Sequence, residues 1–109
     1  MKTAADDLDA KARLTREAWV GDAVLSLYAR EKILREDGVL DGPKCVRMTS
    51  NQFLGTIGEP TKVEAEVARI YARDGLAAAF RWIEERIMPI FEKQEMNRLR
   101  KQGLAQKHE

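Results

Sequence analysis

The sequence predicts an all-α protein, and two observations support this prediction. Apolar residues recur at helical spacing along most of the chain, as Val63, Val67 and Ile70 do at positions i, i+4 and i+7. Glycine and proline stand between the periodic segments, where helices would begin and end, and no segment alternates apolar and polar residues as a strand would. We therefore expect a helical bundle without a second domain.

The first half of the chain predicts two helices. One spans about residues 7–36 and ends at Asp37-Gly38, because glycine readily adopts the left-handed conformation that closes a helix. The other spans about residues 44–57, after the turn Asp41-Gly42-Pro43, and Gly58 is expected to end it. The apolar residues that recur at helical spacing in these two segments are Leu14, Ala18, Val20, Val24, Leu25, Leu27, Tyr28, Ile33, Val46, Phe53, Leu54 and Ile57.

The second half of the chain predicts two more helices. The third begins at Pro60, which suits the first turn of a helix, and ends at Asp74-Gly75. The fourth runs from about residue 76 towards Arg100, and Pro89 is expected to kink or divide it. We expect a single domain over residues 1–109, with a packed core over about 7–100 and a polar tail at 101–109.

Composition and charge narrow the class of protein. The 109 residues suffice for one domain, and the charged residues, 34% of the chain, balance to a net charge of +1, so any RNA-binding surface has to be local. A single cysteine, Cys45, and a single histidine, His108, make a zinc site unexpected. The N-terminus carries Asp6 and Asp7 instead of the apolar run of a signal peptide, and no segment has the length of a membrane span. We expect a cytoplasmic protein that binds no membrane, in which any metal is a hard cation held by carboxylates.

The segment AWVGDAVL, residues 18–25, has a glycine and an acid where a core helix would not be expected to have them. Gly21 costs roughly 1 kcal/mol relative to alanine inside a helix. Asp22 lies between the apolar Val20 and Val24, and a carboxylate next to apolar surface needs a partner. Two unfavourable residues side by side indicate a functional site.

A second segment, TKVEAEVARIY at residues 61–71 followed by GLAAA at 75–79, has an acid, Glu64, within another expected helix. The two segments resemble the two motifs of the ribonuclease III family, in the same order. Ala18 and Thr61 stand where most members have acids, which is similar to the branch called Mini-III ribonuclease, whose members lack a double-stranded-RNA-binding domain. The resemblance covers roughly residues 14–92 and implies a compact ribonuclease III-like helical domain with a shortened middle region between Gly58 and Thr61.

The resemblance implies a metal-dependent endoribonuclease that cleaves structured or double-stranded RNA as a homodimer and leaves 5′-phosphate and 3′-hydroxyl ends. Asp22 and Glu64, one from each of two crossing helices, would be the catalytic and metal-binding residues. The expected cofactor is Mg²⁺, with Mn²⁺ as a substitute, because hydrolysis of a phosphodiester needs a hard divalent ion to polarise the phosphate.

Further residues take roles by the same resemblance. Asn51 and Thr61 would brace the metal-binding carboxylates. Trp19 would insert into a socket on the partner subunit, and Gly21 would let two copies of its helix approach closely. Lys44 and Arg47 would contact phosphate groups of the RNA.

Other interpretations of the same residues stay open. A non-catalytic RNA-binding or structural subunit with the same fold is the first alternative, which the absence of acids at Ala18 and Thr61 favours, and an unrelated helical dimer is the second. Asp22 can instead hydrogen-bond the loop near Asn51, Glu64 can be an ordinary partly exposed acid, and Trp19 can be a core residue. A divalent ion between the two acids would separate these interpretations.

Overall fold

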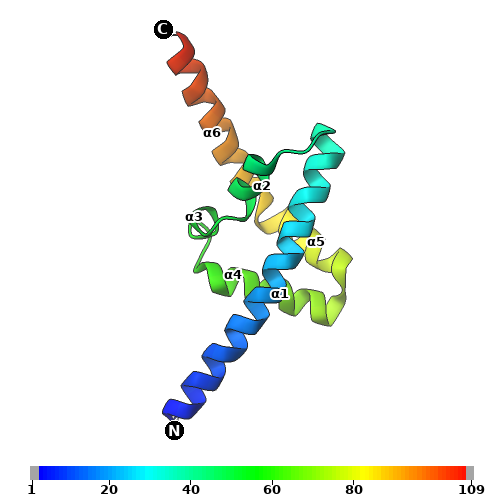
Figure 1. The fold of residues 1–109 in the computed structure, drawn as a ribbon, viewed down its shortest axis with the longest axis vertical. Coiled ribbons are helices and arrows are strands. Elements are labelled where there is room, and N and C mark those ends of the chain that lie inside the picture. The colour runs from blue at the N-terminus through cyan, green and yellow to red at the C-terminus, as the bar shows by residue number, and fades with distance from the viewer. Residues whose placement is uncertain (1–2, 108–109) are drawn as a thin grey trace.

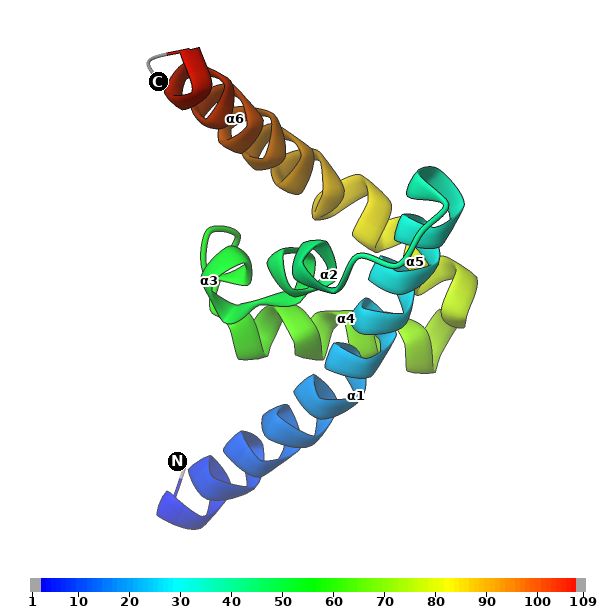
Figure 2. The ribbon, with the colours of Figure 1, turned by 45° about the horizontal axis from the view of Figure 1, so that its top comes forward.

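The chain is helical, as the sequence predicts, in the part that the structure describes. This computed structural model describes the backbone of residues 3–107 and the side chains of residues 3–103. Within these residues six helices follow one another: α1 (Ala4–Asp37), α2 (Gly42–Thr49), α3 (Asn51–Leu54), α4 (Pro60–Asp74), α5 (Leu76–Arg86) and α6 (Met88–Lys107). Figures 1 and 2 show α1 as a long rod crossing the molecule, with its first turns and the end of α6 projecting as two arms.

Helix α1 begins earlier than the sequence analysis placed it and ends where expected. Its start is fixed by a capping box: the Thr3 hydroxyl accepts a hydrogen bond from the backbone N–H of Asp6, and the Asp6 carboxylate accepts one from the N–H of Thr3. Its end is Gly38, whose φ of 73° is in the left-handed region and whose N–H donates to the carbonyl of Leu34.

The single helix expected over residues 44–57 is wrong, because the chain breaks at Ser50. The backbone of Ser50 is extended, with φ −71° and ψ 152°, and its hydroxyl accepts the N–H of Phe53 at 3.1 Å. Serine competes with the helical ladder in this way and starts a new helix, α3. Helix α2 begins two residues before the expected start, at Gly42, because Asp41 caps it and Pro43 fits its first turn.

The second half of the chain follows its local signals closely. Helix α4 begins at Pro60 and ends at Asp74, as predicted. The division expected near Pro89 is confirmed: α5 ends at Arg86, and the proline lies in the first turn of α6, where its missing N–H costs nothing. Helix α6 continues through the expected polar tail as far as Lys107. His108 lies outside the described residues.

One hydrophobic core draws residues from all six helices. The largest side chains without exposed surface are Leu25, Met48, Leu54, Val67, Ile83, Ile87 and Met88. Val20, Leu27 and Val46, three of the apolar residues at helical spacing, are exposed at 40%, 41% and 64%. They lie outside the stripe of their helices that meets a neighbour.

No helix in the described part of the chain has the length and apolar character needed to cross a lipid bilayer.

A buried cation joins three helices beside this core. Lys32 of α1 is 6% exposed, and its Nζ lies 2.7 Å from a carboxylate oxygen of Glu36, 3.5 Å from Glu84 of α5 and 3.6 Å from Glu92 of α6. A buried ammonium is costly unless it is paired, so the three carboxylates hold Lys32 in place and tie α5 and α6 to α1.

Candidate functional site

The candidate site lies where α1 crosses α4. Gly21 is buried there, and a Cβ atom placed on it would lie 1.7 Å from the carbonyl oxygen of Glu64 and 2.5 Å from the carbonyl carbon. Small residues surround this contact, with Ala18 on α1 and Ala65 and Ala68 on α4 all buried. Gly21 therefore allows a close approach of α1 to α4 within one chain, and its place in a dimer interface stays a prediction.

The crossing brings the side chains of Asp22 and Glu64 together. Burial, then a hydrogen bond with Asp22, then the charge of Asp22 raise the pKa of Glu64 to about 7, from an ordinary value of 4.5. The Glu64 carboxyl therefore keeps its proton to a higher pH than an ordinary glutamate, because Asp22 lies beside it. Glu64 is partly exposed, as one open interpretation held, but its pKa departs from that of an ordinary helix acid.

A third acid, Glu59, acts on this pair and was missed in the sequence. Its carboxylate caps α4 by accepting the backbone N–H groups of Thr61, at 3.1 Å, and Lys62, at 3.2 Å. Its negative charge also contributes to the raised pKa of Glu64. The signal that could have found it is an acid directly before a proline, which is a common start of a helix.

Thr61 and Asn51, which were expected to brace the carboxyl pair, have different positions in the structure. Thr61 is in the first turn of α4, on the same side of the helix as Glu64 by its spacing of three residues, and its backbone N–H is held by Glu59. Asn51 is the first residue of α3, and its side chain is exposed. Its backbone carbonyl oxygen accepts a hydrogen bond from the backbone N–H of Gly55 at 2.8 Å. Within residues 3–103 neither side chain forms a hydrogen bond with Asp22 or Glu64.

The two residues expected to contact phosphate both form ion pairs within the chain. The Nζ of Lys44 lies 2.8 Å from a carboxylate oxygen of Asp37. Arg47 reaches across to α6, where its guanidinium lies 2.7 Å from a carboxylate oxygen of Glu95. Lys44 is therefore partly neutralised near α1, whereas Arg47 joins a charged cluster on another side of the fold.

Trp19 is not a core residue, which removes one of the open interpretations. Its side chain is 80% exposed on α1, although an indole buries more apolar area than most side chains when it packs. It stands three residues before Asp22, on the part of α1 that no other helix covers.

The carboxyl pair fits a hard divalent cation. Both ligand atoms would be oxygen. Two carboxylates held close together repel each other unless a proton or a cation lies between them. Mg²⁺ is commonly held by one or two carboxylates, with water and substrate phosphate oxygens filling its shell. Within the described residues no group of three or more acids, histidines or cysteines is close enough to form a full protein cage.

The raised pKa of Glu64 predicts that the protein loses stability as pH rises from about 4.5 to about 7. Over this window the folded state holds a proton that the unfolded state has released, so the free energy of unfolding falls with pH. Glu64→Gln keeps the hydrogen bond and removes the titration. We expect the variant to be more stable than the wild type at pH 8, by less than the full pKa shift implies because solvent screens the partly exposed carboxyl, with no difference at pH 4, in metal-free denaturant unfolding.

Glu66→Gln is the matched control for this pH profile. Glu66 is on the same helix, and its carboxylate faces Arg69 at 3.7 Å rather than another acid. We expect this variant to keep the pH profile of the wild type. A Glu64→Gln variant that is less stable than the wild type at pH 8 would contradict the carboxyl pair.

Comparison with known proteins adds no family to this geometry. A scan against protein-family models and searches of curated proteins and of solved structures gave no match to this chain. What the site can do is therefore argued from its own residues: two carboxyl groups from crossing helices, one of which has a raised pKa beside the other.

Proposed function

We propose that this protein is an endoribonuclease of the ribonuclease III type, dependent on Mg²⁺ or Mn²⁺, which cleaves structured or double-stranded RNA as a homodimer in the cytoplasm. One observation supports the proposal above the others. Asp22 and Glu64, which are 42 positions apart in the sequence (64 − 22), meet as a carboxyl pair at the crossing of α1 and α4. These are the same two acids that the two motif segments pointed to.

The residues have separate tasks in this proposal. Asp22 and Glu64 would hold the cation after Glu64 releases its proton, and the backbone contact at Gly21 would keep the two carboxyl groups at a fixed separation. A bound Mg²⁺ or Mn²⁺ supplies Lewis acidity towards the phosphodiester and lowers the pKa of the attacking water. With so few protein ligands, weak binding and a need for millimolar metal are expected.

The test is cleavage of RNA duplexes and hairpins by the purified protein with Mg²⁺ or Mn²⁺. We expect strand cleavage that depends on the metal, stops with a chelator and leaves 5′-phosphate and 3′-hydroxyl ends. No cleavage of any substrate in either metal would overturn the catalytic proposal.

A non-catalytic RNA-binding subunit is the second candidate function. It is favoured by the lack, within the described residues, of a group of three acids placed to hold a metal ion together, and by Ala18 and Thr61 in places where an acid would add a ligand. The same assay separates the two candidates, because this subunit would bind RNA without cleaving it.

The homodimer part of the proposal is supported by the outer face of α1. Trp19, Ala23 and Leu27 follow one another at intervals of four residues, and all three are exposed. Beside them is a hollow of about 580 Å³ between α1 and α2, lined in part by Ser26, Arg30 and apolar residues such as Leu34 and Leu40. A projecting indole and an apolar hollow thus lie on one face, about 10 Å apart along the helix.

A knob and a hollow on one face suit two-fold symmetry, since each copy would then offer both to the other. With α1 antiparallel to its partner and the axis near Ala23, Trp19 of one copy would lie against the region of Leu27 and Arg30 in the other. Ala23 is small and exposed at the centre, which would let the two helices approach.

Trp19→Ala is expected to weaken the dimer by about 3–5 kcal/mol, which is a hundredfold or more in dissociation constant. The reason is that the indole would be buried only in the partner, since it is exposed in the single chain. Sedimentation equilibrium over a range of protein concentrations measures the effect.

Leu8→Ala is the control for Trp19. Leu8 is also an exposed apolar residue of α1, at 68%, but it is near the start of the helix and does not line the hollow. We expect Leu8→Ala to dimerise like the wild type. A wild-type protein that is monomeric at micromolar concentration would contradict the proposed dimer.

A further inference from the structure

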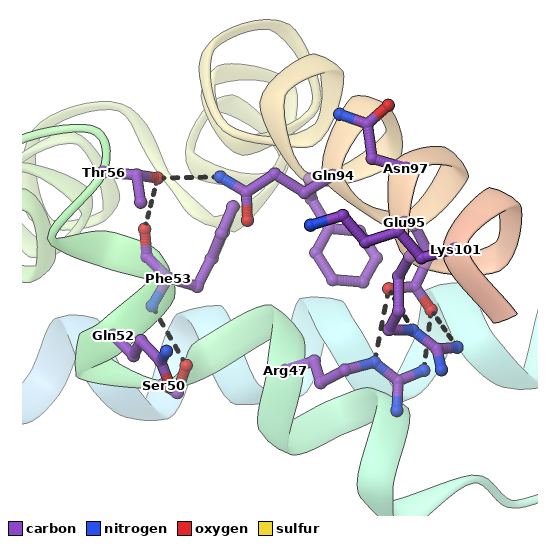
Figure 3. Close-up of a pocket in the computed structure, with 11 residues that line it drawn as sticks. Arg47, Ser50, Gln52, Phe53, Thr56, Gln94, Glu95, Asn97 and Lys101 are labelled. Atoms are coloured by element: carbon purple, nitrogen blue, oxygen red, sulfur yellow. Dashed lines mark hydrogen bonds and ion pairs between the residues drawn. The ribbon is translucent and has the colours of Figure 1, made fainter. Parts of the chain in front are cut away.

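A second hollow, of about 560 Å³, lies between α3 and α6 and is not part of the carboxyl site. Figure 3 shows its walls: Gln52 and Thr56 come from the region of α3, and Gln94, Asn97 and Lys101 come from α6. Its volume is within the range of sites that bind small molecules, about 300–1,000 Å³. We call it the α3–α6 hollow.

The cationic end of the α3–α6 hollow is built around one carboxylate. Glu95 accepts hydrogen bonds from Arg47 at 3.2 and 2.7 Å and from Arg98 at 3.3 and 3.0 Å. Burial opposes ionisation, but the hydrogen bonds from Arg47 and Arg98 hold the pKa of Glu95 below its ordinary value. Glu95 therefore stays charged and fixes both guanidinium groups in one orientation.

The cations at this end outnumber the acid. Arg47, Arg98 and Lys101 line the hollow together with the single carboxylate of Glu95, so its charged side chains sum to +2. Both guanidinium groups bind Glu95 through their Nε and Nη2 atoms, and within residues 3–103 their Nη1 atoms make no hydrogen bond. Fixed guanidinium groups with donors to spare suit an anion such as a phosphate.

The other end of the hollow is neutral and rich in amides. Gln94 donates to the hydroxyl of Thr56 at 3.1 Å, and Gln52 from α3 and Asn97 from α6 also line the hollow. The floor is apolar, because Phe53 and Phe91 pack edge to face there with ring centroids 5.5 Å apart. Amide side chains both donate and accept hydrogen bonds, which suits the polar edge of a nucleobase.

We infer that the α3–α6 hollow binds one nucleotide of an unpaired RNA segment. The phosphate lies against Arg47, Arg98 and Lys101, and the base edge faces Gln94 and Asn97. This inference rests on the proposed function, since it takes RNA as the ligand. It assigns to the enzyme a contact with a single-stranded flank or loop next to the duplex that is cut.

The test is fluorescence anisotropy with a labelled RNA hairpin that has a single-stranded overhang, in EDTA so that no cleavage occurs. We expect Lys101→Ala to weaken binding about three- to tenfold. We also expect the log of the association constant to fall less steeply with the log of the salt concentration, by about 0.7 in slope, because one contact to a single-stranded phosphate is lost. Asn97→Ala is expected to weaken binding without changing this slope. Both variants are expected to bind a blunt duplex like the wild type.

Arg100→Ala is the matched control, since Arg100 is an exposed cation on the same helix that does not line the hollow. It is expected to bind the hairpin within about twofold of the wild type, because one solvated charge outside the contact contributes little. Equal losses for Arg100→Ala and Lys101→Ala would overturn the inference. The inference would also be overturned if an acidic peptide displaced the labelled hairpin as effectively as a single-stranded oligonucleotide of equal charge does.

The outcome is separable from that of the proposed function. A protein that cleaves duplexes but shows equal binding for Lys101→Ala and Arg100→Ala would overturn only the nucleotide site. A protein that binds overhangs through this hollow but never cleaves RNA with metal would overturn only the catalytic proposal.

Discussion

Gly21→Ala is expected to destabilise the protein by about 3 kcal/mol or more, at the upper end of what overpacking costs. The added Cβ would lie 1.7 Å from the carbonyl oxygen of Glu64, and a backbone atom cannot turn aside as a flexible side chain can. Helices α1 and α4 would have to separate, which opens the small-residue contact at the centre of the fold. Denaturant unfolding followed by circular dichroism measures the loss.

Gly42→Ala provides the control for this prediction. A Cβ atom at Gly42 would meet nothing within 4 Å, and the residue is in the first turn of α2. We expect Gly42→Ala to be neutral or slightly stabilising, because alanine restricts the unfolded chain. A Gly21→Ala protein that unfolds at the denaturant concentration of the wild type would show that the close crossing of α1 and α4 is wrong.

Asp22→Asn and Glu64→Gln are each expected to reduce RNA cleavage by about a thousandfold or more without unfolding the protein. A neutral amide is a poor ligand for a hard cation, and losing the cation removes several kcal/mol of stabilisation from the transition state. Single-turnover cleavage of duplex RNA at saturating Mn²⁺ measures the loss. Glu64→Gln is informative here because the same change is expected to stabilise the fold at pH 8, so loss of activity would not reflect loss of structure.

Glu66→Gln is again the matched control. It removes an acid from the same helix, two positions from Glu64, and is expected to cleave RNA at the rate of the wild type. Equal cleavage by the wild type, Asp22→Asn and Glu64→Gln would contradict the site and point to a contaminating nuclease. Tight binding of RNA without cleavage by any of these proteins would favour the non-catalytic RNA-binding subunit.

The two predictions depend on each other through the backbone contact at Gly21. The residue that sets the distance between α1 and α4 precedes Asp22, and the atom it contacts belongs to Glu64. A partly folded Gly21→Ala protein is therefore expected to lose the raised pKa of Glu64 as the two carboxyl groups separate. The glycine and the acid that looked unfavourable in the sequence act at the same place.

The sequence by itself determined the helical class and most helix ends. Hydrophobic periodicity and helix-terminating residues are local signals. Pro60 and Gly75 bound α4, and Gly38 ends α1, because capping and helix-breaking residues act within one turn of their own position. The break in the helix at Ser50 is also signalled locally, because serine is a common N-cap residue. This break was missed in the sequence because serine also occurs inside helices. The two motif segments pointed to Asp22 and Glu64, whose proximity the structure shows.

The tertiary structure decided which surfaces meet, because that depends on how helices cross and not on any one segment. It placed Gly21 in a close contact between α1 and α4. It left Trp19 exposed, surrounded Lys32 with three glutamates, and joined Arg47 to Arg98 through Glu95. The partners of these residues lie up to 60 positions away (92 − 32), beyond the reach of helical spacing, and only burial of a shared core brings them together.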